Sequence, residues 1–182
     1  MSENKNKVNR ANIAILGASG YTGVEAIRLL ANNHNYNIIG LTADTKAGKS
    51  ISEVYPQLSG MNLPDLKKIE DINFSQVDAL ISCLPHGKTQ KILSDIPRHI
   101  KICDLSADFR FEDIYTYEKV YGKNHEAREL QEEAIYGLTE INREKIKNAR
   151  FVSNPGCYPT SALLPIIPLI DNNIIQYGNI IV

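Results

Sequence analysis

The sequence predicts an α/β protein built on a doubly wound, mostly parallel sheet, followed by the start of a second α+β domain. Three observations predict this fold. Strand-like and helix-like segments alternate along the chain. The strand-like segments are apolar at nearly every position, as parallel strands are when helices cover both faces of the sheet. A glycine-rich turn joins the first strand to the first helix, which makes the expected fold Rossmann-like.

The first half of the chain is expected to contain three buried strands and one long loop. The segment Asn12–Leu16 is a short apolar run that ends at a glycine, and Thr22–Ala31 repeats apolar residues at the spacing of one helical face. The aliphatic segment Asn35–Thr42 predicts a second strand. Residues 43–65 carry two glycines and two prolines, which predict a loop. The third strand, Ala79–Leu84, is closed by a proline.

The second half alternates in the same way but is more polar between residues 111 and 147. Short apolar runs predict its strands, and polar, helix-forming stretches between them predict helices. The elements expected there are a helix at Lys88–Ser94, a strand at Ile100–Asp104, a helix over Glu126–Ala134, a short helix from Asn142, a strand at Arg150–Asn154, a helix at Thr160–Ile170 and an apolar strand at Asn179–Val182.

Two domains are expected. Residues 10–156 form a dinucleotide-binding domain, and residues 157–182 supply a helix and the start of an incomplete substrate or dimerisation domain. The chain stops on an apolar run without a turn or a polar tail, whereas natural domain ends are usually solvated. We therefore expect a fragment of a longer protein; a partner chain that completes the last strand is the alternative.

Composition excludes several classes of protein. The 182 residues carry 20 Lys and Arg against 21 Asp and Glu, so the chain lacks the basic surplus that nucleic-acid binding needs. No apolar run is long enough for a membrane span or a signal peptide. Three cysteines without a CxxC spacing predict neither disulfides nor a metal site. A reducing, cytoplasmic compartment is expected.

The glycine turn Gly17-Ala-Ser-Gly20-Tyr-Thr-Gly23 is the expected cofactor site. Gly17 permits a tight turn, Gly20 lets the backbone approach a pyrophosphate, and Gly23 lets the helix pack closely on the sheet. The helix N-terminus offers N–H groups to the phosphates. The residues expected to contact the cofactor are Gly17, Ser19, Gly20, Tyr21, Thr22 and Gly23 in the turn, Thr42 and Lys46 after the second strand, and Leu84, Pro85 and His86 after the third.

The residues alone do not decide between NAD and NADP. Asp44, just after the second strand, would bind a ribose 2′-hydroxyl and favours NAD. Thr42, Thr45 and Lys46 would instead hold a 2′-phosphate. A structural glycine turn without a ligand is the remaining alternative.

The second motif, Ser153-Asn-Pro-Gly-Cys157-Tyr-Pro-Thr160, follows a strand and precedes a helix. Cys157 is therefore expected at a helix N-terminus, where the helix dipole and unpaired N–H groups favour the thiolate. Thiolates attack acyl groups and form thioesters, which a reduced nicotinamide can reduce to aldehydes. Cys83 and Cys103 lie inside apolar strands and are expected to be inert.

Five motifs together resemble the N-acetyl-γ-glutamyl-phosphate reductase family. They are GASGYTG, LPHG at Leu84–Gly87, DLSADFR at Asp104–Arg110, YGLTE at Tyr136–Glu140 and SNPGCYPT. The resemblance implies NADPH-dependent reduction of N-acetyl-L-glutamyl 5-phosphate to its semialdehyde, with Cys157 as nucleophile and a homo-oligomer when full length. It also implies an acid/base histidine in a second domain, which no histidine of this chain matches. Related enzymes of aminoadipyl phosphate or aspartyl phosphate, and a non-catalytic dinucleotide-binding module, are the alternatives.

The remaining polar residues of interest are expected either to contact the acyl-phosphate substrate or to lie at the protein surface. Substrate contacts are expected from Ser106, Arg110 and Asn154, with an ion pair of Arg110 to Asp104, Asp108 or Glu112 as its structural alternative. His34, His99 and His125 are expected at the surface, and His86 near the cofactor.

Overall fold

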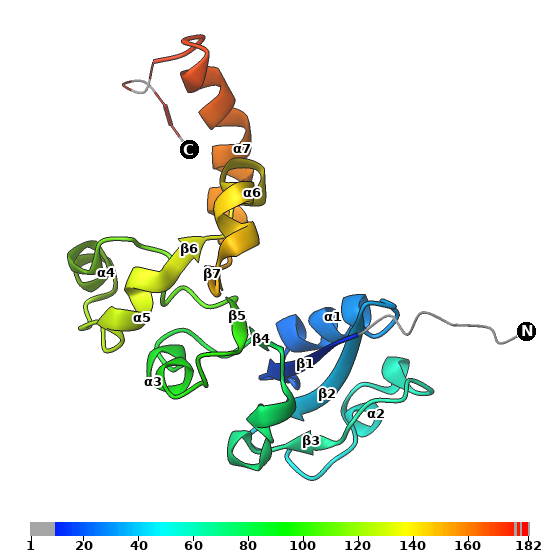
Figure 1. The fold of residues 1–182 in the computed structure, drawn as a ribbon. Helices are drawn as coiled ribbons and strands as arrows, with labels where there is room; N and C mark the ends of the chain where they lie inside the picture. The colour runs from blue at the N-terminus through cyan, green and yellow to red at the C-terminus, as the bar shows by residue number, and fades with distance from the viewer. Residues whose placement is uncertain (1–9, 177, 179, 182) are drawn as a thin grey trace, which may run out of the picture.

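The structure is a computed structural model that describes residues 10–176, 178, 180 and 181. Seven strands form one sheet in the order β3-β2-β1-β4-β5-β7-β6, and every neighbouring pair is parallel (Figure 1). The strands are β1 (Ala11–Leu16), β2 (Tyr36–Thr42), β3 (Leu66–Lys67), β4 (Ala79–Ser82), β5 (Lys101–Asp104), β6 (Ala134–Tyr136) and β7 (Phe151–Ser153). The predicted parallel α/β fold is confirmed.

Six of the helices of the described residues lie in the connections between strands, and α7 follows the last strand. The helices are α1 (Tyr21–Leu30), α2 (Ile51–Val54), α3 (Thr89–Ser94), α4 (Ile114–Tyr121), α5 (Arg128–Glu133), α6 (Thr139–Asn148) and α7 (Cys157–Asp171), with single 3₁₀ turns at Pro56–Leu58, Ile69–Asp71 and Phe74–Gln76. None of the helices in the described ranges has both the length and the apolar character that crossing a bilayer requires.

Two hydrophobic cores lie on the two faces of the sheet. In β1, Ile13 and Ile15 belong to one core and Ala14 and Leu16 to the other, because successive side chains of a strand point to opposite faces. The first core includes Ile27 of α1 and Ile51 of α2, and the second includes Leu93 of α3 and Leu130 of α5. Helices therefore cover both faces, and this explains why the strands are apolar without alternation.

The strand order reverses between β1 and β4, which places a topological switch point at the centre of the sheet. In parallel sheets of this kind, ligands bind outside the carboxyl ends of the strands at such a point. The loops that leave that edge of the sheet include the glycine turn after β1, residues 43–50 after β2, residues 83–88 after β4, residues 105–113 after β5 and residues 154–156 after β7.

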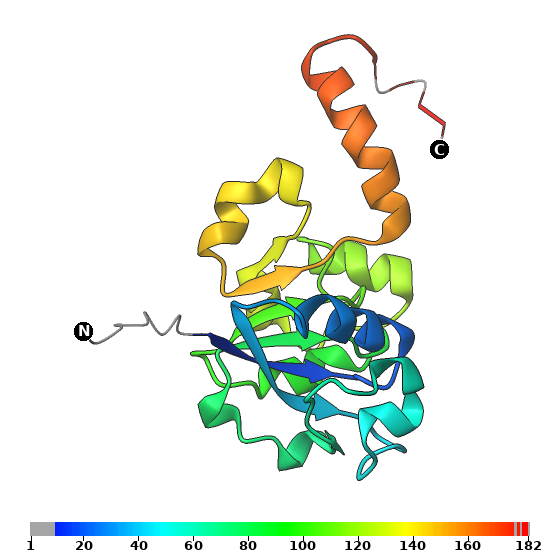
Figure 2. The same cartoon turned by 90° about the vertical axis from the view of Figure 1, so that its right-hand side faces the viewer.

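Helix α7 extends away from the rest of the molecule (Figures 1 and 2). It is rich in apolar residues, yet none of them is buried in the described structure. It begins at Cys157, three residues before the predicted start. The first turn closes there because the Thr160 amide and hydroxyl both donate to the Gly156 carbonyl, at 3.0 and 2.8 Å. The division into domains at residue 156 stays a prediction.

Four regular elements were not predicted, and each is short. Helix α2 has four residues and lies within residues 43–65, which were expected to form a loop; Ser50 caps it, because its hydroxyl accepts from the Glu53 amide and the Glu53 carboxylate accepts from the Ser50 amide. Strands β3 and β6 have two and three residues, and α4 lies in the polar stretch that was predicted to be helical only further along. The expected short helix from Asn142 starts earlier, at Thr139, and Asn142 itself departs from helical geometry with φ of −107°. The predicted strand Asn179–Val182 lies partly outside the described residues, and Ile180 and Ile181 are in no regular element.

Candidate functional site

The glycine turn packs against the end of β4. Gly17 has a left-handed φ of +71°, and a Cβ there would lie 2.7 Å from the carbonyl oxygen of Cys83. Its amide donates to the Thr42 hydroxyl at 3.1 Å, and the Ala18 amide donates to the Thr42 carbonyl at 2.8 Å. The glycine turn thus contacts the end of β2 and the loop after β4, and only glycine fits position 17.

Gly23 and Gly20 differ in what surrounds them. A Cβ on Gly23 would lie 2.5 Å from the Gly17 carbonyl oxygen, so a side chain there would push α1 away from the turn. A Cβ on Gly20 would meet only the Gly17 carbonyl oxygen, at an ordinary 3.5 Å. Packing therefore requires glycine at 23, whereas position 20 faces open space.

The space in front of Gly20 suits an anionic group. The first hydrogen bond of α1 runs from the Val24 amide to the Gly20 carbonyl, at 2.9 Å. The amides of Tyr21, Thr22 and Gly23 precede that bond, so they have no acceptor within the helix and lie at its positive end. A bare glycine backbone followed by such amides fits a pyrophosphate.

The side of the turn is formed by residues that follow β2. The Tyr55 hydroxyl donates to the Ser19 carbonyl at 2.9 Å, and the Lys46 ammonium lies 5.9 Å from the Tyr55 ring centroid. Lys46 therefore lies next to the turn, as its predicted role requires. Thr42 is buried and its hydroxyl already accepts from Gly17, so its role in the structure is to hold the turn; a contact of Thr42 with cofactor stays a prediction.

His86, in the loop after β4, is held by a buried carboxylate. Its Nδ1 lies 2.7 Å from Oδ1 of Asp108, and its ring centroid lies 4.4 Å from that of Tyr121. The imidazole is about one third exposed, whereas the Asp108 side chain is fully buried. Leu84 and Pro85 precede it in the same loop and are half-buried and exposed, respectively.

Asp108 was not predicted as a site residue except as a partner of Arg110. Its carboxylate accepts from the Gly87 amide at 2.8 Å, the Thr89 amide at 3.2 Å and the Tyr117 hydroxyl at 3.2 Å, in addition to His86. Burial, together with the Asp108 charge, raises the pKa of Tyr117 to about 12, so the phenol stays a donor. No local sequence signal marks this convergence, because its members come from three separate segments.

The three thiols occupy different environments. Cys157 is exposed and is the first residue of α7. Cys83 directly follows β4 and Cys103 lies in β5; both are half-buried, and burial raises the pKa of Cys83 to about 12 and that of Cys103 to about 11. Since the thiolate is the reactive form, Cys83 and Cys103 are poor nucleophiles at neutral pH.

Arg110 joins the loop after β5 to the cysteine turn. Its Nε donates to the Asn154 carbonyl and its Nη2 to the Leu105 carbonyl, both at 2.9 Å. A Cβ on Gly156 would lie 2.9 Å from Nη1, so the guanidinium lies directly against the residue before Cys157. Among the ion pairs of the described residues, none joins Arg110 to Asp104, Asp108 or Glu112.

Ser106 and Asn154 are engaged within the protein. The Ser106 hydroxyl is buried; its oxygen lies 2.5 Å from Oδ2 of Asp104 and 3.0 Å from the Thr89 hydroxyl. Asn154 donates from its side chain to the Pro155 carbonyl at 3.0 Å and from its amide to the Asp104 carbonyl at 2.8 Å. Their contacts with substrate stay predictions.

The prediction for His125 is wrong. His34 and His99 are exposed as expected, but His125 is only 3% exposed. Its ring packs edge-on against Phe109 and Tyr117, its Nε2 lies 3.0 Å from the Asp108 carbonyl oxygen, and its Nδ1 accepts from the Ala127 amide at 3.3 Å. Burial lowers its pKa. The polar sequence around it gave no sign of this, since the aromatic partners come from other segments.

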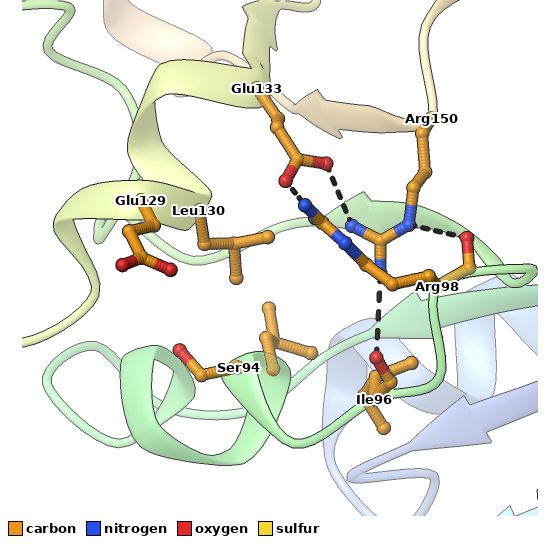
Figure 3. Close-up of a pocket in the computed structure, with 8 residues that line it drawn as sticks. Ser94, Ile96, Arg98, Glu129, Leu130, Glu133 and Arg150 are labelled. Atoms are coloured by element: carbon orange, nitrogen blue, oxygen red, sulfur yellow. Dashed lines mark hydrogen bonds and ion pairs between the residues drawn. The ribbon is translucent and has the colours of Figure 1, made fainter.

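A cavity of about 180 Å³ lies away from these residues (Figure 3). It is lined by Leu93, Ser94, Ile96, Arg98, Glu129, Leu130, Glu133 and Arg150. Glu133 pairs with both Arg98 and Arg150, and Arg150 also donates to the Arg98 carbonyl. The residues precede β5 and β7, so the cavity opens at the amino edge of the sheet, opposite to the glycine and cysteine turns.

Comparison with known proteins identifies a family model that matches most of the chain. The model described as semialdehyde dehydrogenase, NAD-binding domain, matches residues 12–149. The match covers the glycine turn, the loop of His86 and the loop of Arg110, and it ends before the cysteine turn.

Curated relatives match over a longer range. A protein of Oryza sativa, named a probable chloroplastic N-acetyl-γ-glutamyl-phosphate reductase, is 55% identical over 170 residues, which are 93% of this chain and 41% of the relative. A protein of Arabidopsis thaliana with the same name is 54% identical, over 93% of this chain and 42% of its own. An N-acetyl-γ-glutamyl-phosphate reductase of Rhodospirillum rubrum is 51% identical, over 95% of this chain and 51% of its own. The chain thus spans about half the length of the curated relatives it matches.

Solved structures share the fold at low sequence identity. Aspartate semialdehyde dehydrogenase II of Vibrio cholerae, complexed with ASA, superposes with a TM-score of 0.61 at 18% identity, over 90% of this chain and 47% of that one. Aspartate semialdehyde dehydrogenase of Candida albicans with NADP gives 0.58 at 17% identity, over 90% and 48%.

Proposed function

This chain belongs to the semialdehyde dehydrogenase family, and we propose that it supplies the NADP-binding part and the nucleophilic cysteine of an N-acetyl-γ-glutamyl-phosphate reductase. One structural observation carries the proposal: an exposed cysteine begins a 15-residue helix at the sheet edge that also carries the glycine turn. The names of relatives that are 51–55% identical support the choice of substrate, N-acetyl-L-glutamyl 5-phosphate.

In this proposal the glycine turn binds the pyrophosphate of NADP(H). The open face of Gly20 and the free amides at the start of α1 support this role. Lys46, beside Tyr55, is placed next to the turn and would neutralise a 2′-phosphate. When bound, the reduced nicotinamide supplies a hydride. Leu84, Pro85 and His86 are assigned to the same ligand, because their loop contacts the turn at Gly17.

Cys157 is the proposed nucleophile. Its thiolate attacks the acyl carbon of the substrate; a C–S bond forms, the C–O bond to phosphate breaks, and inorganic phosphate leaves with the electron pair. The N–H groups at the start of α7 stabilise negative charge on the sulfur and on the acyl oxygen. Cys157 is exposed, so a substrate can reach its sulfur, whereas Cys83 and Cys103 are half-buried.

Arg110 is proposed to bind the phosphate or carboxylate of the substrate while it holds the cysteine turn. Nε and Nη2 are occupied by backbone carbonyls, which leaves Nη1, beside Gly156, to face a ligand. Asn154 would act from the cysteine turn, and Ser106, whose hydroxyl is buried and bonded within the protein, would shape the loop of Arg110. We assign no general acid or base among the 182 residues and expect it in the remainder of the full-length enzyme, which we expect to be a cytoplasmic homo-oligomer.

The decisive experiment uses a chimaera in which this chain replaces the matching half of the Rhodospirillum rubrum relative. We expect phosphate-dependent reduction of NADP⁺ with N-acetylglutamate semialdehyde. Cys157→Ser should abolish this turnover but retain cofactor binding, because a serine hydroxyl is a far weaker nucleophile without a neighbouring base. Cys103→Ser is the matched control and should keep its activity. Undiminished turnover in Cys157→Ser would refute the proposed mechanism.

A further inference from the structure

A continuous chain of hydrogen bonds links two buried carboxyl groups behind the site. Ser106 Oγ contacts Oδ2 of Asp104 at 2.5 Å, Ser106 Oγ contacts Thr89 Oγ1 at 3.0 Å, and Thr89 Oγ1 contacts Oδ2 of Asp108. Four oxygens are therefore joined by three hydrogen bonds. All four residues are buried.

The hydrogens of this chain can be counted. Each hydrogen bond needs one hydrogen, and the two hydroxyl groups supply only two. The Asp108 amide also donates to Ser106 Oγ, at 3.1 Å, but its hydrogen does not lie on any of the three bonds of the chain. The third hydrogen must therefore be carried by one of the two carboxyl groups.

Oδ2 of Asp108 cannot carry this third hydrogen. Its Oδ2 also accepts from the Gly87 and Thr89 amides, at 3.0 and 3.2 Å, and its Oδ1 accepts from Gly87 and Tyr117. A hydrogen on Oδ2 would leave too few lone pairs on that oxygen for the two amides that donate to it. Asp104 differs: its Oδ2 contacts the Ser106 hydroxyl, its Oδ1 is buried without a hydrogen bond of normal geometry, and fewer donors therefore face it than face Asp108.

We propose that Asp104 is a neutral carboxylic acid in the folded protein, and that its Oδ2 hydrogen is donated to Ser106 to complete the chain from Asp104 to Asp108. The Ser106 hydrogen then points to Thr89, and that of Thr89 to Asp108. A single negative charge remains, on Asp108, where five donor groups surround it. The inference rests on this geometry and does not depend on the reaction proposed above.

The surroundings of Asp104 agree with a neutral group. Burial is the largest influence on Asp104 and raises its pKa; contacts with Ser106 and Ser82 oppose this effect, and the negative charge of Asp108 adds to it, so that the pKa is raised overall. The other titratable groups that interact with Asp104 are the thiols of Cys83 and Cys103, which are uncharged at neutral pH. Its flanking residues on β4 and β7, Ser82 and Ser153, are uncharged.

This assignment makes Asp104 a positioning residue for the site. Its carbonyl accepts from the Asn154 amide, and the next residue, Leu105, accepts from Arg110. Through Ser106 and Thr89 it also connects to Asp108, which holds His86. If Asp104 lost its proton, one hydrogen bond of the chain would be lost and two buried negative charges would face each other.

Infrared spectroscopy of the 182-residue chain tests the protonation state directly. We expect the carbonyl stretching band of a protonated carboxylic acid at neutral pH, and we expect Asp104→Asn to remove it. Carboxyl ¹³C NMR of aspartate-labelled wild-type protein gives the same information without a variant: one aspartate should keep the shift of the acid form at neutral pH. Absence of such a signal in the wild-type chain, or its survival in Asp104→Asn, would overturn the assignment.

Two matched variants provide a second readout. An asparagine at 104 can donate from its amide to Ser106, so Asp104→Asn should unfold at the same temperature as wild type or higher. An asparagine at 108 would turn its amide hydrogens toward other donors, so Asp108→Asn should unfold at a clearly lower temperature. The reverse order would mean that Asp108 carries the proton, and the proposal would be wrong.

Discussion

At the scale of single residues, the three glycines of the first turn serve separable purposes. Gly17 and Gly23 are required by contacts of 2.7 and 2.5 Å that a Cβ would make with backbone atoms. Gly20 has no such requirement, since its φ is −90° and its Cβ position is open. A glycine that the fold does not need is best explained by a ligand that needs the space, which is the role we propose for position 20.

Substitution at these positions should separate binding from stability. Gly20→Val places a side chain where the pyrophosphate is proposed to lie and should abolish NADP(H) binding measured by calorimetry, while unfolding free energy changes by about 1 kcal/mol or less. Gly23→Ala, the control, forces backbone atoms apart and should cost about 1–3 kcal/mol of stability. Equal affinity of wild type and Gly20→Val for NADP(H) would show that the cofactor binds elsewhere.

The burial of His125 predicts a pH dependence of stability. Burial holds its folded-state pKa below the usual value of about 6.5, so the unfolded chain binds a proton first as the pH falls. Its contribution to stability is thus complete above about pH 7 and is lost as the pH falls below about 6.5, by at most about 1.4 kcal/mol per pH unit. Denaturant unfolding across this range should show a smaller pH slope for His125→Gln than for wild type; identical slopes would exclude His125 as the cause.

The sequence predicted the position of a residue correctly where that position depends on a single local motif. The glycine turn and Cys157 were placed correctly at a strand–helix junction, because turn and helix-start chemistry is local. The burial of His125 and the convergence of donors on Asp108 were not predictable, since their partners come from loops up to 22 residues away, such as the pair Asp108 and Gly87 at a separation of 21. Only the tertiary structure brings such segments together.

At the scale of elements, the cysteine turn is fixed by its contact with the loop after β5. Arg110 bonds the Asn154 carbonyl on one side and the Leu105 carbonyl on the other, and its Nη1 lies against Gly156. The start of α7, and with it the sulfur of Cys157, is therefore positioned by a side chain from another loop.

A methyl group at position 156 should disturb this contact. Gly156→Ala places a Cβ 2.9 Å from Nη1 of Arg110 and 3.3 Å from Cδ of Pro159, while the backbone φ of −71° is suitable for alanine. The flexible arginine can move aside, so stability should fall by only about 1 kcal/mol, whereas kcat/KM of the chimaera should fall about tenfold. In a double-mutant cycle with Arg110→Gln the two effects should not add. Additive losses would show that the glycine acts independently of Arg110.

The shortest strands could not be predicted from the sequence. Strands β3 and β6 pair at the two edges of the sheet with only two and three residues, too few for an apolar run to mark them. Ala134 was assigned to the end of a helix but begins β6, because pairing with Phe151 of β7 outweighs local propensity. The central strands were predicted correctly, since their burial on both faces leaves an unbroken apolar signal.

At the scale of the whole molecule, the parallel sheet brings every proposed functional loop to one edge. The amino edge instead carries a structural cluster in which Glu133 joins Arg98 and Arg150, and the cavity there has no part in the proposed chemistry (Figure 3). The chain spans about half the length of its curated relatives, and α7, the last described helix, buries none of its residues. We therefore propose that this chain contains the cofactor site and the nucleophile. The remaining catalytic groups are proposed to lie in the half of the relatives that this chain does not match.

It follows that the 182 residues alone should bind NADP(H) but turn over little or no substrate. General acid–base catalysis typically contributes about 10²–10⁴-fold to rate, and no acid or base is assigned within the chain. Positioning of the acyl phosphate, worth about 7–11 kcal/mol of barrier, would need the half of the relatives that this chain does not match. The test compares phosphate-dependent NADP⁺ reduction by the chain alone, by the chain with the other half of the Rhodospirillum rubrum relative added in trans, and by the covalent chimaera. Activity should rise in that order. Robust turnover by the chain alone would place the acid or base within these residues, and His86, held by Asp108 with its ring one third exposed, would be the first residue to replace.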